Sequence, residues 1–238
     1  MKITAVIPAY HEKGNIGELS IRLKTAFVTL GLDYNIFFVI QGNDGSVEEL
    51  QELKRYEIPQ LCWAFFPDPL GVGLAFRHGF QHLAPDCTHV LTLDADLNHQ
   101  PEELPAFVEA IQCSGTDIVV GSRYIPGGMV LGMPLWKFAL SRLVNVLFYY
   151  TTGLRVADKT SGYRLMRREV VDLLKTATVS NGFAFYVEFL WKAHLAGYTI
   201  HEIPIVFKWR VAGQSKMHKF PTLLSYLALL WRTLWKVG

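Results

Sequence analysis

Along the first 125 residues, continuous apolar runs alternate with segments in which apolar positions recur every three or four residues. The runs predict buried strands at 2–10, 34–41, 61–66, 88–96 and 117–124. After the first run, apolar side chains between Ile16 and Leu30 share one stripe of a predicted helix. Apolar strands separated by helices are typical of a mostly parallel sheet covered on both faces. We therefore predict an α/β fold.

Residues 134–150 predict a helix with a different balance of polar and apolar positions. Its aliphatic and aromatic positions surround one narrow polar face, which consists of Lys137, Ser141, Arg142 and Asn145. Such a helix is too polar to span a bilayer and too apolar to face water. We expect it to lie in the lipid interface, and a core helix of the domain is the alternative.

The last residues, 219–238, repeat this pattern. Arg232 and Lys236 are one helical turn apart, and Trp231 and Trp235 lie beside them. Two such helices in one short chain favour contact with a membrane surface, with a subunit contact as the alternative.

Charge divides the chain into two unlike halves. Residues 1–136 contain 8 Lys and Arg against 16 Asp and Glu, whereas residues 137–238 contain 15 against 5. Either the halves neutralise each other within one domain, or the basic half meets phosphate groups or an anionic membrane. Nucleic acid is not expected as a partner, because no zinc, helix-turn-helix or interleaved aromatic and basic motif is present.

Composition narrows the class of protein. Hydrophobic residues make up 50% and charged residues 18%, which excludes a disordered chain. The cysteines, Cys62, Cys87 and Cys113, lack C-x-x-C spacing and predict neither disulfides nor a zinc site. The chain begins directly with a strand and contains no long uncharged apolar run. We therefore expect a peripheral protein at the cytoplasmic face of a membrane.

The most specific candidate for chemistry is Asp94-Ala95-Asp96 at the end of an apolar run. Residues i and i+2 of a strand point the same way, so both carboxylates would face one spot beyond the sheet. Ligands of open α/β sheets bind at that edge. Paired carboxylates repel each other without a cation, and their hard oxygens suit Mg²⁺ or Mn²⁺ that bridges to substrate phosphates.

Five segments together resemble one enzyme family, in its order and approximate spacing. They are VIPAYHEKGNI (6–16), LDADLNHQPEEL (93–104), GSRYIPGG (121–128), DKTSGYRLMRREV (158–170) and RVAGQSK (210–216). The chain resembles the family 2 inverting glycosyltransferases of the GT-A fold, and among them the polyprenyl-phosphate glycosyltransferases of the dolichol-phosphate mannose synthase type. This implies a GT-A domain over 1–218, with a nucleotide-sugar half (1–125) and an acceptor half (126–218), before the amphipathic helix at 219–238.

The resemblance implies roles for individual residues. The nucleotide-sugar pocket is expected to contain Pro8, Tyr10, Glu12, Asp94 and Arg123. The metal is expected on Asp94, Asp96 and Asn98, where Asn98 stands at a position that often holds Gln or Ser in relatives. The acceptor and its phosphate are expected on Arg142 and Ser215. The residues that stabilise the leaving diphosphate, and so carry catalysis, are expected to be Asp96, Arg210 and Lys216.

The second strand departs from the family pattern. Relatives usually have Val-Asp-Asp-Gly-Ser at its end, whereas this chain has Gln41 and Gly42 followed by Asn43-Asp44-Gly45-Ser46. Asp44 is retained, and Gln41 or Asn43 could still hydrogen-bond a base edge. The preference for a base is therefore open.

The implied reaction transfers a hexose to a polyprenyl phosphate with inversion and with a divalent metal, Mg²⁺ or Mn²⁺. Mannose from GDP-mannose is the first candidate for the donor, and a UDP-hexose is the second. A phosphate monoester with a second pKa of about 6 is already ionised at neutral pH, so the reaction needs no general base. A family 2 transferase acting on a glycan or protein hydroxyl would need one. The third possibility is a membrane scaffold that binds a nucleotide sugar without turnover.

Overall fold

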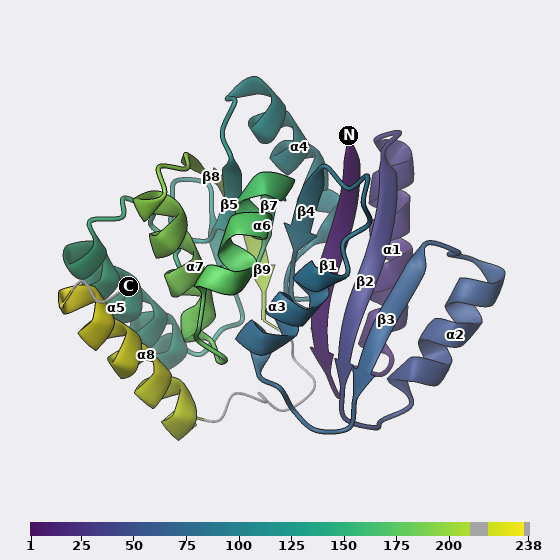
Figure 1. Ribbon diagram of the computed structural model, residues 1–238, viewed down its shortest axis with the longest axis horizontal. Coiled ribbons are helices and arrows are strands. Elements are labelled where there is room, and N and C mark those ends of the chain that lie inside the picture. Colours follow the sequence, from purple (N-terminus) through teal and green to yellow (C-terminus); the bar gives the residue numbers. More distant parts are fainter. Residues whose placement is uncertain (210–218, 236–238) are drawn as a thin grey trace.

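A seven-stranded sheet runs through the protein (Figure 1). The computed structural model describes residues 1–209 and 219–235, and the strands lie in the order β3-β2-β1-β4-β7-β5-β8. Their bounds are β1 Lys2–Tyr10, β2 Asp33–Gln41, β3 Leu61–Phe66, β4 His89–Thr92, β5 Ile118–Ser122, β7 Arg164–Arg167 and β8 Ile200–Pro204. All neighbours are parallel except the pairs that β7 makes with β4 and β5. The predicted mostly parallel α/β fold is confirmed.

Helices cover both faces of this sheet. One face carries α1 (Asn15–Thr29), α2 (Ser46–Tyr56) and α4 (Leu104–Cys113), which follows a 3-10 turn at Pro101–Glu103; the other carries α3 (Val72–Gln81), α6 (Arg168–Ala177) and α7 (Ala184–Leu195). Because strand side chains alternate, β1 sends Ile3, Ala5 and Ile7 into the first core and Val6 into the second. This two-sided burial explains why the strands read as continuous apolar runs.

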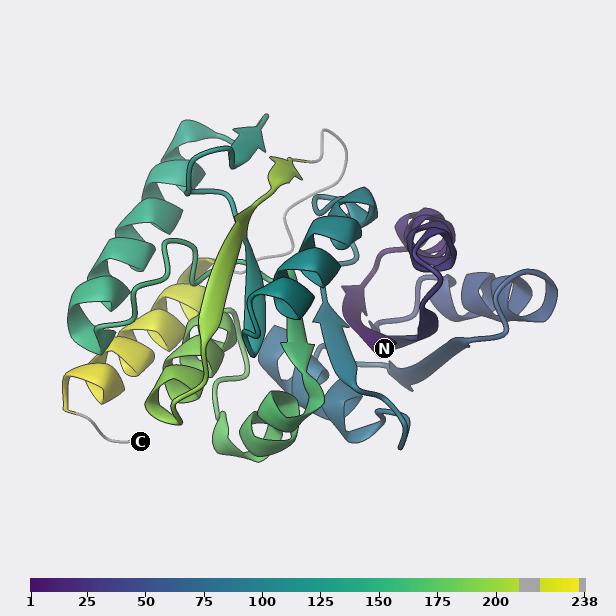
Figure 2. The same cartoon turned by 90° about the horizontal axis from the view of Figure 1, so that it is seen from above.

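Two more helices, α5 (Leu135–Thr152) and α8 (Lys219–Leu234), lie side by side against α7 at one end of the molecule (Figures 1 and 2). Phe148 of α5, Val187 of α7 and Leu229 of α8 share a small separate core. A two-stranded parallel sheet of β6 (Met129–Leu131) and β9 (Val206–Lys208) completes the fold.

The helix α5 presents its apolar side to the outside. Leu135 is 85% exposed and Tyr150 78%, whereas the polar Asn145 is 4% exposed and faces the protein. On α8, Trp231 is 62% exposed. The alternative of a core helix at 134–150 is therefore wrong. Among the residues that the structure describes, no helix is long and apolar enough to cross a bilayer.

A buried carboxylate attaches α8 to the rest of the protein. Glu188 of α7 accepts hydrogen bonds from the backbone N–H groups of Val179 and Ser180. Its Oε1 lies 2.9 Å from Nη2 of Arg232 on α8 and 3.7 Å from Nζ of Lys192. Burial would raise the pKa of Glu188, but these hydrogen bonds and the Arg232 charge bring it below its ordinary value. The carboxylate is therefore held in its charged form.

Candidate functional site

The strand order reverses between β1 and β4. From β1 the chain adds β2 and β3 on one side, and β4 pairs with the other side of β1. The carboxyl ends of β1 to β3 lie at the lower edge in Figure 1. Ligands of open α/β sheets bind beyond the carboxyl ends at such a reversal. The segment after β1 carries Glu12 and the segment after β4 carries Asp94, and the Glu12 charge raises the pKa of Asp94, so the two segments approach each other there.

The two aspartates lie in a turn rather than on a strand, which corrects the expected strand at 88–96. β4 ends at Thr92 because the chain then turns through Ala95 to Leu97. Leu97 has a φ of 61°, a conformation that costs a branched residue energy and that folds tend to keep at functional sites. The acids therefore share an edge because of this turn, and not through the alternation of a strand.

The turn is held by its own side chains. Asn98 donates from its backbone N to Oδ1 of Asp96 at 3.2 Å and from Nδ2 to Oδ2 at 2.7 Å. Buried His99 accepts at Nδ1 from the backbone N–H of Asp94 at 3.4 Å, and burial lowers the pKa of His99 to about 4. His99 is consequently neutral at physiological pH and acts as an acceptor that fixes the turn.

Asp94 has an unusual environment for a carboxylate. Its side chain remains 36% exposed, yet Oδ1 accepts a 2.7 Å hydrogen bond from the buried hydroxyl of Tyr186. Burial raises the pKa of Asp94 and the Glu12 charge adds to this, while the Tyr186 hydrogen bond and the Arg123 charge oppose it. A cation placed here would relieve the repulsion between the carboxylates.

The donor set fits a divalent metal that also binds substrate. Asp94 and Asp96 offer hard carboxylate oxygens, and Asn98 can ligate through Oδ1 because its Nδ2 donates to Asp96. Among the described residues no group of three or more His, Cys, Asp or Glu side chains is placed to hold a metal. Mg²⁺ typically takes one or two protein carboxylates, with phosphate oxygens and water as its other ligands. The set therefore suits a metal completed by a diphosphate.

The predicted nucleotide residues at the ends of β1 and β2 and just after them make hydrogen bonds that hold the following loops. Glu12 accepts from Nδ2 of Asn15 at 2.6 Å. Oε1 of Gln41 accepts from the backbone N–H of Leu70 at 2.8 Å. Asp44 accepts from the backbone of Lys13 and Ser46, each at 3.0 Å. Burial would raise the pKa of Asp44, but these bonds bring it below its ordinary value.

Pro8 and Tyr10 lie in the last part of β1, where they pair with Val39 and Gln41 of β2. The next residue, His11, has a φ of 53°. The β1 and β2 residues thus stand at the edge where the nucleotide pocket is expected, and their contact with a nucleotide stays a prediction.

On the other side of the aspartates, Arg123 forms a buried ion pair with Asp158. Nε of Arg123 lies 2.7 Å from Oδ2 and Nη2 lies 2.8 Å from Oδ1, and Nη2 also donates to Thr160 at 2.8 Å. Burial would raise the pKa of Asp158, but the Arg123 charge and hydrogen bonds bring it below its ordinary value. Asp158 and Thr160 were not among the expected site residues, although they belong to one of the five matching segments.

The polar face of α5 joins this pair. Ser141 accepts a 2.7 Å hydrogen bond from the Tyr124 hydroxyl, and its Oγ lies 3.2 Å from Oγ1 of Thr160. The guanidinium of Arg142 stacks on the Tyr124 ring at 4.8 Å. The predicted acceptor residue Arg142 is therefore next to the Arg123 cluster, with its own side chain at the surface.

The predicted residues Arg210, Ser215 and Lys216 lie outside the described residues. The described chain before them passes the turn that carries Asp94 and Asp96, since the backbone N–H of Lys208 donates to the carbonyl of Asn98 at 3.0 Å. Their proposed contact with phosphate stays a prediction.

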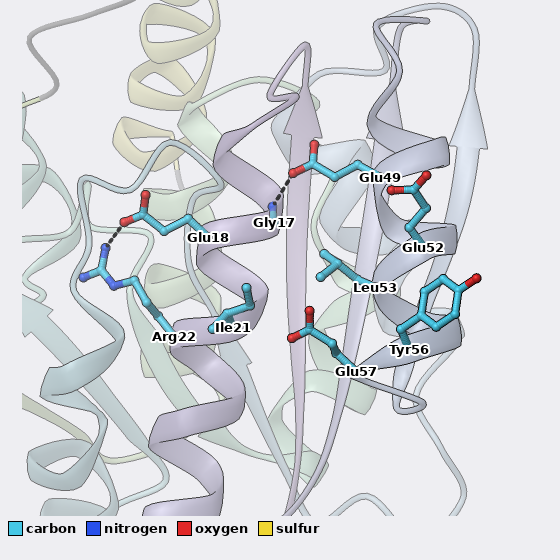
Figure 3. A pocket seen from close by; sticks show the side chains of 9 residues that line it. All are labelled: Gly17, Glu18, Ile21, Arg22, Glu49, Glu52, Leu53, Tyr56 and Glu57. Carbon is cyan, nitrogen blue, oxygen red and sulfur yellow. Dashed lines mark hydrogen bonds and ion pairs between the residues drawn. The ribbon is translucent and has the colours of Figure 1, made fainter.

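A separate open cavity of about 570 Å³ lies between α1 and α2 (Figure 3). It contains none of the predicted site residues. Four glutamates line it against a single arginine, Arg22, and they are Glu18, Glu49, Glu52 and Glu57. An acidic lining repels a diphosphate, which argues against this cavity as a diphosphate site.

Comparison with known proteins decides the family. The sequence model of Glycosyl transferase family 2 matches residues 4–174, which include the turn with Asp94 and Asp96 and the Arg123–Asp158 pair. The chain belongs to glycosyl transferase family 2. The predicted resemblance to family 2 is thereby confirmed, and the matched residues include four of the five segments.

Two relatives of this family 2 chain have informative names. It is 32% identical over 215 residues to polyprenol monophosphomannose synthase of Mycolicibacterium smegmatis, covering 89% of this chain and 79% of the relative. It is 32% identical over 236 residues to dolichol-phosphate mannosyltransferase of Pyrococcus furiosus, covering 98% of this chain and 63% of the relative. This chain therefore spans less than two thirds of the Pyrococcus enzyme.

Solved structures show the same fold. Glucosyl-3-phosphoglycerate synthase from Mycobacterium tuberculosis in complex with Mn²⁺ and UDP-glucose matches with a TM-score of 0.69 at 15% identity, over 100% of this chain and 80% of that one. Its complex with phosphoglyceric acid matches with a TM-score of 0.68 at 17% identity, over 99% and 79%. At this identity the likeness establishes the GT-A fold of the family 2 chain.

Proposed function

We propose that this family 2 enzyme transfers a hexose from a nucleotide-diphosphate sugar to a polyprenyl phosphate, with inversion and with Mg²⁺ or Mn²⁺. Mannose is the first candidate for the hexose. The names of both relatives support the acceptor and the sugar. The base of the donor, GDP or UDP, is left to the experiment.

One observation carries this proposal, and it is the orientation of α5. Its inward side chains, Ser141 and Asn145, bond to Thr160 beside the Arg123–Asp158 pair, while its outward side chains are apolar and exposed. The helix thus places a polar cluster, with Arg142 beside it, behind an exposed apolar surface. A substrate with a phosphate on a hydrocarbon chain requires these two environments together.

On the donor side, the chain binds and orients a diphosphate. The turn at Asp94 and Asp96 presents carboxylate oxygens at the edge of the sheet, and a bound divalent metal would neutralise the charge of the leaving nucleoside diphosphate. The loops after β1 and β2, held by Glu12 and Asp44, bound the region for the nucleotide. Arg210 and Lys216 are proposed to stabilise the same leaving charge.

On the acceptor side, the chain needs to position a nucleophile that is already ionised. A phosphate monoester has a second pKa of about 6, so its oxygen can attack the anomeric carbon without transfer of a proton to the protein. Catalysis then consists of placing the two substrates in line and stabilising charge. We assign Arg142 and Ser215 to the acceptor phosphate.

We expect release of nucleoside diphosphate from one donor in a panel of GDP- and UDP-sugars, in the presence of Mn²⁺ and a short polyprenyl phosphate. The rate should fall to the background level without acceptor, because water is a poor substitute for a positioned phosphate. Coupled measurement of GDP and UDP gives the base directly.

The matching unphosphorylated polyprenol is the control for this assay. Equal release with the polyprenol would contradict a phosphate acceptor and favour a hydroxyl acceptor. Donor binding without release for any acceptor would favour the scaffold alternative.

We further propose that α5 and α8 contact a membrane at its cytoplasmic face. Their exposed apolar side chains lie on adjacent helices at one end of the molecule (Figure 2), and they include Leu135, Leu143, Tyr150, Leu227 and Trp231. A soluble monomer rarely exposes so many large apolar residues on one surface. The basic second half of the chain would add attraction to anionic lipids.

We expect the protein to co-sediment with vesicles that contain anionic lipid. Replacing Trp231 and Leu227 by serine should weaken partitioning by roughly a hundredfold or more, because each buried large side chain contributes about 1.5–3 kcal/mol and about 1.4 kcal/mol is a factor of ten. The control is Val28→Ser, another exposed apolar residue, on α1. Unchanged sedimentation of the double variant would assign this surface to a protein contact.

A further inference from the structure

The Asp94 carboxylate accepts a hydrogen bond from a side chain outside its own turn. Among the described residues this donor is the hydroxyl of Tyr186. Tyr186 lies on α7 and is separated from Asp94 by 92 residues in sequence, yet its hydroxyl donates to Oδ1 at 2.7 Å. The side chain is buried, so water does not replace this bond at low cost. The other oxygen, Oδ2, lies 3.8 Å from Nδ1 of buried His99, which is beyond hydrogen-bond distance.

Tyr186 is itself held from several sides. The guanidinium of buried Arg164 donates to the Tyr186 carbonyl at 2.9 Å and lies 5.4 Å from the centre of its ring. Arg164 also donates to the carbonyls of Ser161 and Lys159. Phe76 packs against the ring edge-on at 5.8 Å. Few rotamers remain open to a ring confined in this way.

The chain also leaves space for the hydroxyl. A Cβ on Gly162 would lie 3.0 Å from the Tyr186 hydroxyl and 3.1 Å from the adjacent ring carbons. Gly162 does not have a positive φ, so the backbone conformation does not require glycine there. The lack of a side chain at residue 162 is explained by the phenol that occupies the space.

From these contacts we infer that Tyr186 is a positioning residue for the metal site: it fixes Asp94 so that one carboxylate oxygen is presented to the metal and the other is tied to the protein. The inference rests on the proposed function for the metal itself. Groups that hydrogen-bond a metal ligand orient it, and their loss typically weakens metal binding by 10–100-fold.

The test measures the affinity of the protein for Mn²⁺ in the presence of GDP and, in parallel, of UDP. Electron paramagnetic resonance reports the concentration of the free ion. Tyr186→Phe should bind Mn²⁺ roughly tenfold more weakly than the original chain. Gly162→Ala should weaken binding in the same direction, because it displaces the hydroxyl without altering residue 186. Raising Mn²⁺ in the release assay should restore kcat of Tyr186→Phe, which a general loss of structure would not allow.

The matched control is Tyr34→Phe, which removes a hydroxyl from β2 whose contact with Gln60 is 3.5 Å long. It should bind Mn²⁺ as the original chain does. Unchanged Mn²⁺ affinity of Tyr186→Phe overturns the inference, as does an original chain that binds no Mn²⁺ with either nucleotide. Normal Mn²⁺ binding without acceptor-dependent release would instead contradict the proposed function and leave the role of Tyr186 standing.

Discussion

Replacement of Asp96 by alanine is expected to reduce turnover roughly 10³-fold while the protein remains folded. The carboxylate has two tasks in the proposed site, since it is a proposed ligand of the metal and accepts two hydrogen bonds from Asn98. Its loss removes one proposed ligand and the two hydrogen bonds that orient a second. The folded state should tolerate the change, because Asp96 lies in a partly exposed turn outside both main cores.

Initial rates of nucleoside diphosphate release, together with thermal unfolding, measure the two halves of this prediction. Asp86→Ala is the matched control, because Asp86 pairs with Lys2 at the surface and lies at the amino end of β4. Its rate should equal that of the original chain. Substantial turnover of Asp96→Ala, or of the original chain in excess chelator, would contradict the metal role.

Replacement of Arg123 by alanine is expected to lower the free energy of unfolding by about 3–5 kcal/mol. The variant leaves the fully buried Asp158 carboxylate without the guanidinium that binds both of its oxygens. Because a domain is typically stable by only 5–15 kcal/mol, this is a large effect. Asp158→Ala should cost a similar amount, since it strands the cation instead.

Urea unfolding of both single alanine variants and of the double variant Arg123→Ala with Asp158→Ala closes the comparison. The double variant should lose less stability than the sum of the single losses, because neither charge is left alone in it. Additive losses would show that the two side chains contribute independently and that the bidentate pair is not what they share.

The central strands could be predicted from sequence because burial on both faces leaves a continuous apolar run. β1 and β3 were both predicted with their observed bounds. β7 could not be recognised, since Arg164–Arg167 is a four-residue strand with an arginine at each end. Its antiparallel place in the sheet depends on neighbours that are more than 40 residues away in sequence.

The candidate site, like the fold, could be predicted only in part from the sequence. The two aspartates were identified from their position after an apolar run, but the expected strand geometry was wrong because β4 ends early and a positive φ at Leu97 turns the chain. Tyr186 and Asp158 were missed for a different reason. Asp158 lies in one of the five matching segments, but its partner Arg123 is 35 residues away in sequence, and the Tyr186 hydroxyl bonds to Asp94 across 92 residues.

The orientation of α5 could not be predicted from the pattern of polar and apolar residues either. Its narrow polar face was visible in the sequence, yet a helix of this kind can bury either side. The structure buries the polar side because Asn145 and Ser141 find partners in Thr160 and in the backbone of Lys159. These hydrogen bonds offset the free-energy cost of burying the polar groups.

The carboxylate of Glu188 restricts how the helix α8 of such an enzyme can diverge. An unrelated segment that replaced α8 would remove Arg232 and leave a buried negative charge without the cation that lies 2.9 Å from it. Such an exchange has to bring a cation to the same place or change residue 188 at the same time. Inheritance of α8 and of α7 is therefore linked, although neither Glu188 nor Arg232 is assigned to a substrate.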